Sequence, residues 1–181
     1  MSTIRLLLLG TLLQRPLHGY ELRRELEQWD AGRWANIAYG SIYFGLSKMA
    51  EEELVELIEV SSVANRPARS VYAITSAGRR EFERLLREHW WEVKPSLEPF
   101  LAALAFMPYL RRDDLLAALH RRASLLRSGR EELAQAGQAK LSQPGTPRHV
   151  AEITRLMGAR VEAELHWLEQ VTDRVERGEL P

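Results

Sequence analysis

The stretch YGSIYFGLSKMAEEELVELIEV, residues 39–60, decides the fold. Ile42, Leu46 and Met49 recur at helical spacing and the pattern becomes strand-like from residue 54, which predicts a helix leading directly into a strand. The other face of this helix carries aromatic, hydroxyl and basic groups, and no carboxylate occurs from residue 31 to residue 50. A face that met only water would mix acidic and basic side chains. The pattern therefore favours a helix that lies against an anionic, grooved surface, as a DNA-recognition helix does.

Two helices are predicted in front of this stretch. Residues 3–13 are apolar almost all round, which indicates a buried helix with a close helix crossing at Gly10, ended by Pro16 and a turn at Gly19. Residues 20–29 are amphipathic, and the positions that face inward are Leu22, Leu26 and Trp29. With residues 30–38 as the connection, the order is that of a helix-turn-helix.

A basic hairpin is predicted after the recognition helix. Residues 57–63 and 70–74 are β-branched and apolar, and a turn between them contains Asn65 and Pro67. A hairpin in this position makes the unit a winged helix, in which the third helix enters the major groove and the wing contacts phosphates or the minor groove. The predicted DNA-binding residues are Tyr39, Ser41, Tyr43, Phe44, Ser47 and Lys48 on the helix and Arg66 and Arg69 on the wing. For Phe44, contact with a thymine methyl or a sugar and burial at the helix edge both remain open.

The second half of the chain is helical by pattern. Thr75 caps a helix that carries Phe82, Leu85 and Leu86 inward, and Pro95 and Pro99 mark a boundary between residues 1–94 and residues 95–181. Helices are then expected over residues 100–109, from residue 113, and from Thr146 and Pro147 to about residue 177. Inward positions of the middle helix are Leu115, Leu116, Leu119, Leu125 and Leu126. The last helix has a coiled-coil-like seam that indicates packing on a partner, formed by Val150, Ile153, Met157, Val161, Leu165, Leu168, Val171 and Val175.

The composition of the chain further limits the classes of function that it can have. The 25 basic and 25 acidic residues balance, yet residues 31–50 and 60–80 carry six basic side chains and no acid, which fits a neutral protein with one basic face. The absence of cysteine excludes disulfides and thiolate chemistry. The short apolar run near the N-terminus is neither a secretory signal nor a membrane span, so we expect a cytoplasmic protein.

Enzymatic and metal-binding functions have little support in the sequence. No GxSxG, HExxH or phosphate-binding glycine loop occurs, and the five histidines include no pair at the spacing used by zinc-binding helices. We therefore expect no catalytic residues, no metal and no cofactor. His18 fits a turn histidine that hydrogen-bonds to the backbone, and the acidic triplet 51–53 fits the solvated end of the recognition helix.

Trp90, Trp91 and Trp167 allow two interpretations. They can pack in the core or in a dimer interface, or they can offer flat faces for an aromatic or hydrophobic effector. Core or dimer packing is favoured for each tryptophan taken singly, while a pocket that uses at least one of them is the best candidate for an effector site.

The strings LLLLGTLLQRPLHGYELRREL, GSIYFGLSKMAEEELV and VYAITSAGRREFERLL resemble the PadR family of transcriptional regulators over residues 4–91. The second half is similar to the longer type with a multi-helix C-terminal dimerisation domain. The resemblance implies a mainly α fold with a small β-hairpin wing, an N-terminal winged helix-turn-helix and a C-terminal helical dimerisation and effector domain. It also implies a homodimer that represses transcription from a palindromic operator on double-stranded DNA until a small molecule releases it.

The chain departs from the family pattern at two positions. Glu53 stands where the family commonly has glycine before the strand, and Phe44 stands where smaller, proline or basic residues are more frequent. The alternative function is a winged-helix dimer that does not bind DNA and serves as a protein-interaction adaptor. Zero net charge and residues 51–53 favour it, whereas the acid-free segment before residue 51 disfavours it. An enzyme acting on a small aromatic substrate has only the tryptophans in its favour.

Overall fold

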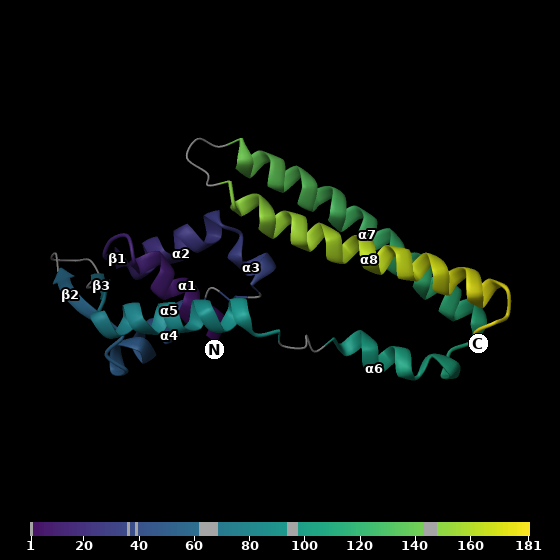
Figure 1. The fold of residues 1–181 in the computed structure, drawn as a ribbon, viewed down its shortest axis with the longest axis horizontal. Coiled ribbons are helices and arrows are strands. Elements are labelled where there is room, and N and C mark those ends of the chain that lie inside the picture. Colours follow the sequence, from purple (N-terminus) through teal and green to yellow (C-terminus); the bar gives the residue numbers. More distant parts are fainter. Residues whose placement is uncertain (1, 36, 39, 62–68, 94–97, 143–147) are drawn as a thin grey trace. The chain divides into compact units, whose positions relative to one another are not determined.

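The chain forms two compact units, Met1–Pro95 and Ser96–Pro181 (Figure 1). The computed structural model describes residues 2–35, 37–38, 40–61, 69–93, 98–142 and 148–181. The elements of the first unit are α1 (Ser2–Leu12), β1 (Leu17–His18), α2 (Gly19–Gln28), α3 (Ala31–Trp34), α4 (Ser41–Glu51), β2 (Val55–Ser61), β3 (Arg69–Ile74) and α5 (Ser76–Trp91). Those of the second unit are α6 (Pro99–Ala105), a 3-10 turn (Met107–Tyr109), α7 (Arg112–Leu141) and α8 (Val150–Glu176).

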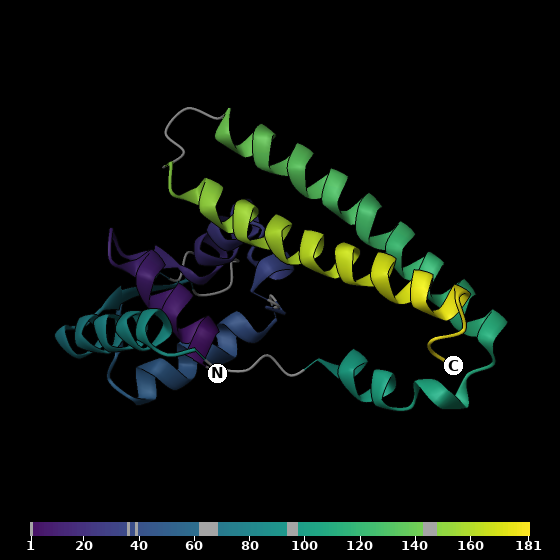
Figure 2. The same ribbon diagram turned by 45° about the vertical axis from the view of Figure 1, so that its right-hand side comes forward.

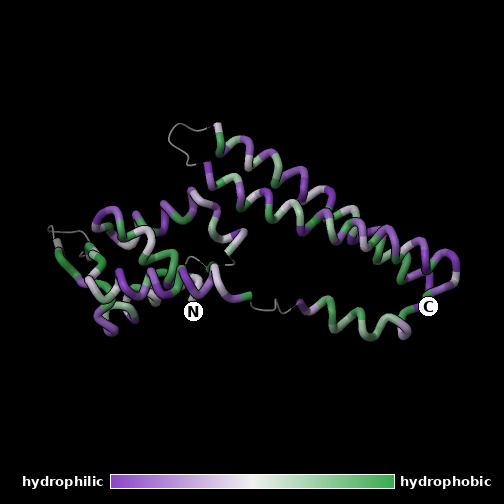
Figure 3. The backbone as a smooth tube through the Cα atoms, in the orientation of Figure 1, coloured by the Kyte–Doolittle hydropathy of each residue, from purple (hydrophilic) through white to green (hydrophobic). Residues whose placement is uncertain are grey.

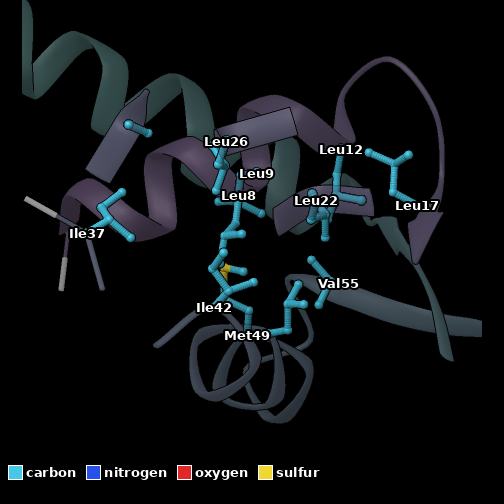
Figure 4. Close-up of a cluster of buried hydrophobic side chains, with 12 residues drawn as sticks. Leu8, Leu9, Leu12, Leu17, Leu22, Leu26, Ile37, Ile42, Met49 and Val55 are labelled. Carbon is cyan, nitrogen blue, oxygen red and sulfur yellow. The ribbon is translucent and has the colours of Figure 1, made fainter. Parts of the chain in front are cut away.

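The core of the first unit surrounds α1 (Figure 4). Leu8, Leu9 and Leu12 of this helix are fully buried, and they share one cluster with the buried side of α4 and with residues of α2. At Gly10 the ring of Phe82 from α5 lies so close that an added Cβ would be 2.9 Å from Phe82 Cε2. The close helix crossing predicted at Gly10 is confirmed.

A three-stranded antiparallel sheet, in the order β1-β3-β2 within the described residues, closes this unit. The hairpin pairs from Val55 opposite Ile74 to Ser61 opposite Arg69, with a register shift between Leu57 and Glu59. The sequence did not predict β1, in which Leu17 pairs with Tyr72 and is buried. Two residues are too few to show an alternating pattern, and the partner strand lies more than fifty positions away.

The turn between α4 and β2 places Glu53 in the left-handed region, with φ of 57°. The amide of Leu54 donates to the carbonyl of Met49 at 2.9 Å and that of Glu53 to the carbonyl of Ala50 at 3.1 Å, which is the hydrogen-bond pattern of a Schellman motif. Glycine usually occupies this position because it has no Cβ to clash. Glu53 in place of the family's glycine therefore keeps the hydrogen bonds of the turn, at the cost of backbone strain at this residue.

The start of α5 is fixed by a side-chain cap and a glycine. The amide of Gly78 donates to Thr75 Oγ1 at 3.0 Å, so the predicted cap is confirmed. The same hydroxyl donates to the carbonyl of Glu53 at 2.8 Å, which ties α5 to the turn after α4. A Cβ on Gly78 would lie 2.0 Å from the carbonyl oxygen of Leu54, so only glycine fits there.

The second unit is built on α7 and α8, which lie side by side and antiparallel in both views (Figure 2). A close approach occurs at the buried Gly137, where an added Cβ would be 2.7 Å from Thr154 Cγ2. Ion pairs join arginines of α7 to glutamates of α8, at 2.6 Å for Arg130–Glu162 and 3.6 Å for Arg127–Glu169. The buried apolar side chains of this hairpin are Leu115, Leu119, Ala123, Leu165, Leu168, Val171 and Val175.

Apolar and hydrophilic residues alternate along both long helices, whereas α6 is apolar along its length (Figure 3). In the described segments, no helix is both long enough and apolar enough to span a membrane.

Several details of the sequence prediction are corrected. Residues 31–34 of the expected connection form α3, whose Trp34 indole donates to the carbonyl of Trp29 at 2.8 Å. The helix expected over residues 100–109 ends at Ala105 and is followed by the 3-10 turn. The last helix begins at Val150, while Thr146 and Pro147 lie outside the described residues.

Three side chains predicted to face inward are exposed: Trp29, Leu86 and Leu125. Trp29 lies beyond the last residue of α2, where the helical phase ends. Leu86 follows the buried Leu85 by one position, and Leu125 follows the buried Ala123 by two. Because a helix turns about 100° per residue, both side chains point away from the buried side.

Candidate nucleic-acid interface

The exposed side of α4 is the candidate interface. Ile42, Leu46 and Met49 are fully buried against α1, and the opposite side of the helix presents Phe44 and Ser47 to solvent. Phe44 is 65% exposed, the larger of the two aromatic exposures on this helix. Because the buried residues anchor α4 along its whole length, the exposed side chains are held on a rigid element.

One edge of α4 borders a groove of about 430 Å³, which is lined by the N-terminal turn of α1 and by Ile37. Ser41 and Lys48 lie on this edge, together with one side of Phe44. The hydroxyl of Ser41 donates to the carbonyl of Ala38 at 2.6 Å, so it positions the start of α4 and keeps its oxygen available as an acceptor.

The other edge of α4 rests on the start of α2. Tyr43 is 48% exposed, and its ring lies where a Cβ on Gly19 would come within 2.8 Å of Tyr43 Cε1. Next to this contact the rings of His18 and Tyr20 stack at 5.5 Å, and Tyr20 is about half exposed. His18 Nδ1 lies 3.4 Å from the carbonyl oxygen of Ser70, the kind of backbone contact expected for it. Tyr20 joins the candidate surface although the sequence did not single it out, since its placement depends on β1.

The remaining predicted DNA-binding residues cannot be located as side chains. Tyr39 and Arg66 lie outside the described residues, and Arg69 is the first residue of β3, described by its backbone alone. The wing contacts therefore remain a prediction.

Acidic side chains gather where α4 ends. Glu51, Glu52 and Glu53 are exposed, as expected for the solvated end of the helix. Glu52 pairs with Arg5 of α1 at 2.7 Å, and Arg5 also lies 3.5 Å from Glu81 of α5. This network draws one of the three charges toward α1 and ties the end of α4 to two other helices.

The carboxyl of Glu81 is the member of this network whose pKa is shifted. Hydrogen bonds from Arg84, and to a smaller extent the charge and hydrogen bonding of Arg5, hold the pKa of the Glu81 carboxyl below its ordinary value of 4.5. Partial burial opposes this effect without cancelling it. Glu81 is therefore ionised in the folded protein under neutral conditions, and its role is structural.

The tryptophans differ in their surroundings. Trp90 and Trp91, at the end of α5, are 78% and 81% exposed. The interpretation that they pack in the core of their own unit is therefore wrong for both. Trp167 of α8 is half-buried, and its ring meets Phe100 edge-on at 5.8 Å. The guanidinium of Arg122 covers the Phe100 ring at 3.6 Å. The role of these tryptophans in effector binding remains a prediction.

Metal binding finds no support in the described part of the chain, where no group of three or more histidine, aspartate or glutamate side chains is placed to hold an ion.

The first unit has the architecture of a winged helix-turn-helix. Helices α2 and α4 form the helix-turn-helix pair, and the β2–β3 hairpin occupies the place of the wing. Residues 8–84 match the model of the transcriptional regulator PadR-like family. The predicted resemblance to this family and the predicted fold class are confirmed.

Similar solved structures extend over both units. Bacillus subtilis PadR in complex with operator DNA is 18% identical, with a TM-score of 0.74 over 94% of this chain and 98% of that chain. The same protein in complex with p-coumaric acid is 16% identical, with a TM-score of 0.73 over 96% and 99%. The Vibrio cholerae virulence activator AphA is 20% identical, with a TM-score of 0.72 over 96% and 98%. At these levels of sequence identity, the structural similarity shows the fold alone. No match was found among curated protein sequences.

Proposed function

We propose that this protein is a homodimeric transcriptional repressor that binds a palindromic operator on double-stranded DNA and is released by a small aromatic or hydrophobic ligand. The exposed side of α4 carries the proposal: an aromatic and hydroxyl surface, anchored by buried residues, on the helix that a winged helix-turn-helix places in the major groove. The likeness to PadR in complex with operator DNA adds support at the level of the fold.

Symmetry sets the geometry of this function. A dimer presents two copies of α4, and to read both half-sites they must lie about one DNA turn, roughly 34 Å, apart. A ligand that binds better to a dimer with another spacing shifts the population away from the DNA-binding form.

A second copy of the chain is a fitting partner for the second unit. Leu101, Phe106 and Tyr109 are exposed around α6 and the 3-10 turn, and such apolar clusters favour association. The exposed rings of Trp90 and Trp91 provide flat apolar faces of the kind that an aromatic effector would need.

The test introduces one negative charge on the exposed side of α4 and, as a matched control, one elsewhere. Ser47→Glu should weaken binding at least about tenfold, because the carboxylate meets DNA phosphates and base-edge acceptors. Gln28→Glu makes the same change of net charge on the exposed end of α2 and should bind like the unaltered protein. Binding is measured by fluorescence anisotropy on duplexes enriched from a random pool by the full-length protein, at two salt concentrations.

Enrichment of a palindromic sequence that only the Ser47→Glu variant fails to bind would support the proposal. Enrichment of no sequence, with equal weak binding by all three proteins, would overturn it and favour the adaptor function. Sedimentation equilibrium of the same samples measures the oligomeric state, and a monomer at the concentrations used for binding would exclude the symmetric mode.

A further inference from the structure

We infer that Phe44 selects thymine in the operator by packing its ring on the thymine C5-methyl group. This inference rests on the proposed function and adds to it the base chemistry that one residue reads.

The fold itself does not need an apolar residue at position 44. The buried side of α4 is complete without it, because Ile42, Leu46 and Met49 are each at most 1% exposed and form the contact with α1. Phe44 is 65% exposed, and one side of it borders the groove beside the N-terminal turn of α1 without being covered there. Burial at the helix edge, the other interpretation left open by the sequence, does not describe this residue.

The position of Phe44 on the helix suits contact with base edges. It is the fourth residue of α4, and recognition helices of this class touch bases mainly with their N-terminal part. Ser47 lies one turn further along the same side, and Phe44 precedes the first acidic residue of the helix, Glu51, by about two turns. A phenyl ring at this point therefore faces the floor of the major groove, where the base edges are.

The chemistry of a phenyl ring then restricts the base. Guanine, cytosine and adenine present hydrogen-bonding groups in the major groove, and thymine adds a methyl group, the apolar feature of the groove. A ring placed over the polar edges would remove water from them without replacing its hydrogen bonds, which is unfavourable. Packing on the methyl group instead buries apolar surface on both partners. The hydroxyls of Tyr43 and Ser47 remain for polar contacts with bases or phosphates.

The experiment compares selected operators and then deletes the methyl group alone. Full-length protein and the Phe44→Ala variant are each used to enrich duplexes from a random pool, with Phe44→Leu as a variant that keeps an apolar side chain. In the best operator of the unaltered protein, each symmetric pair of thymines is replaced by deoxyuridine, which lacks the C5-methyl group and changes no hydrogen bond.

We expect one symmetric thymine pair to be strongly selected by the unaltered protein and by Phe44→Leu, and to lose its selection with Phe44→Ala. Deoxyuridine at that pair should weaken binding of the unaltered protein by about fourfold per methyl group, or roughly fifteenfold for both half-sites. It should leave the affinity of Phe44→Ala unchanged, and deoxyuridine at other thymines should have no effect on either protein.

Two kinds of failure are distinguishable. If the unaltered protein selects an operator but Phe44→Ala selects the same one, or if deoxyuridine changes affinity equally for both, the inference is wrong and the proposed function stands. If no operator is selected, the proposed function fails and the inference with it. A change of oligomeric state or of thermal unfolding in Phe44→Ala, with base selection intact, would show that the ring covers another protein surface and would overturn the inference.

Discussion

Replacing Glu53 by glycine should stabilise the N-terminal unit. The φ of 57° at Glu53 lies in the left-handed region, which costs a residue with a Cβ roughly 1–2 kcal/mol. Glycine removes this cost but gives the unfolded chain additional freedom worth about 0.5–1 kcal/mol. At the middle of these two ranges, the free energy of unfolding should therefore rise by about 0.75 kcal/mol, which corresponds to an increase of about 1.5–3 °C in Tm for a chain of this length.

The structure gives the Glu53 backbone little room to escape the strain. Its amide donates to Ala50, its carbonyl accepts from Thr75 Oγ1 at 2.8 Å, and its side chain is exposed. The same motif ends α8, where Gly178 has φ of 76° and Glu179 donates to the carbonyl of Arg174 at 2.9 Å. The chain thus contains both a strained and an unstrained version of one turn.

Urea unfolding followed by far-ultraviolet circular dichroism measures the effect. Glu53→Gln removes the charge but keeps the Cβ, so it should unfold like the unaltered protein. Glu51→Gly places the glycine at the last residue of α4, where φ is helical, so it should destabilise by up to about 1 kcal/mol. If Glu53→Gly unfolds at the same urea concentration as Glu53→Gln, or at a lower one, backbone strain at this turn is refuted.

Two further predictions concern the contacts around α5. Gly78→Ala should destabilise the protein by about 1–3 kcal/mol or prevent folding, because the added Cβ would meet the carbonyl of Leu54. The control is Gly129→Ala in α7, where the added Cβ meets nothing within 4 Å. It should be neutral or stabilising in the same urea assay. Since the folded pKa of Glu81 is lowered, its ion pairs should contribute stability above pH of about 4.5 and lose it as the pH falls through the folded value. Glu81→Gln should therefore flatten the acid side of a Tm-against-pH curve, and an unchanged curve would show that this carboxyl is not linked to folding.

Sequence periodicity was sufficient for the elements that carry their own local signal. The buried side of α4, the Thr75 cap and the crossing at Gly10 all follow from residue types at fixed spacing. The strand β1 does not, because two residues become a strand only through pairing with β3.

The candidate site divides in the same way. The exposure of Phe44 and Ser47 follows from the helical phase of their buried neighbours. The arrangement of His18, Tyr20 and Tyr43 does not, because it depends on β1 and on the missing Cβ of Gly19. The exposure of Trp90 and Trp91 contradicts a rule based on residue type, since large apolar rings are usually covered within their own unit.

The contact of Gly10 with Phe82 also bears on how the protein is made. About 70 residues separate the two, so at 5–20 residues per second the apolar surface of α1 emerges from the ribosome on the order of 4–14 s before the helix that crosses it. During that interval Leu8, Leu9 and Leu12 have no complete core to enter. The nascent chain therefore presents a leucine-rich segment suited to chaperone binding until the hairpin and α5 have been synthesised, and a chain cut short before α5 would keep that segment exposed.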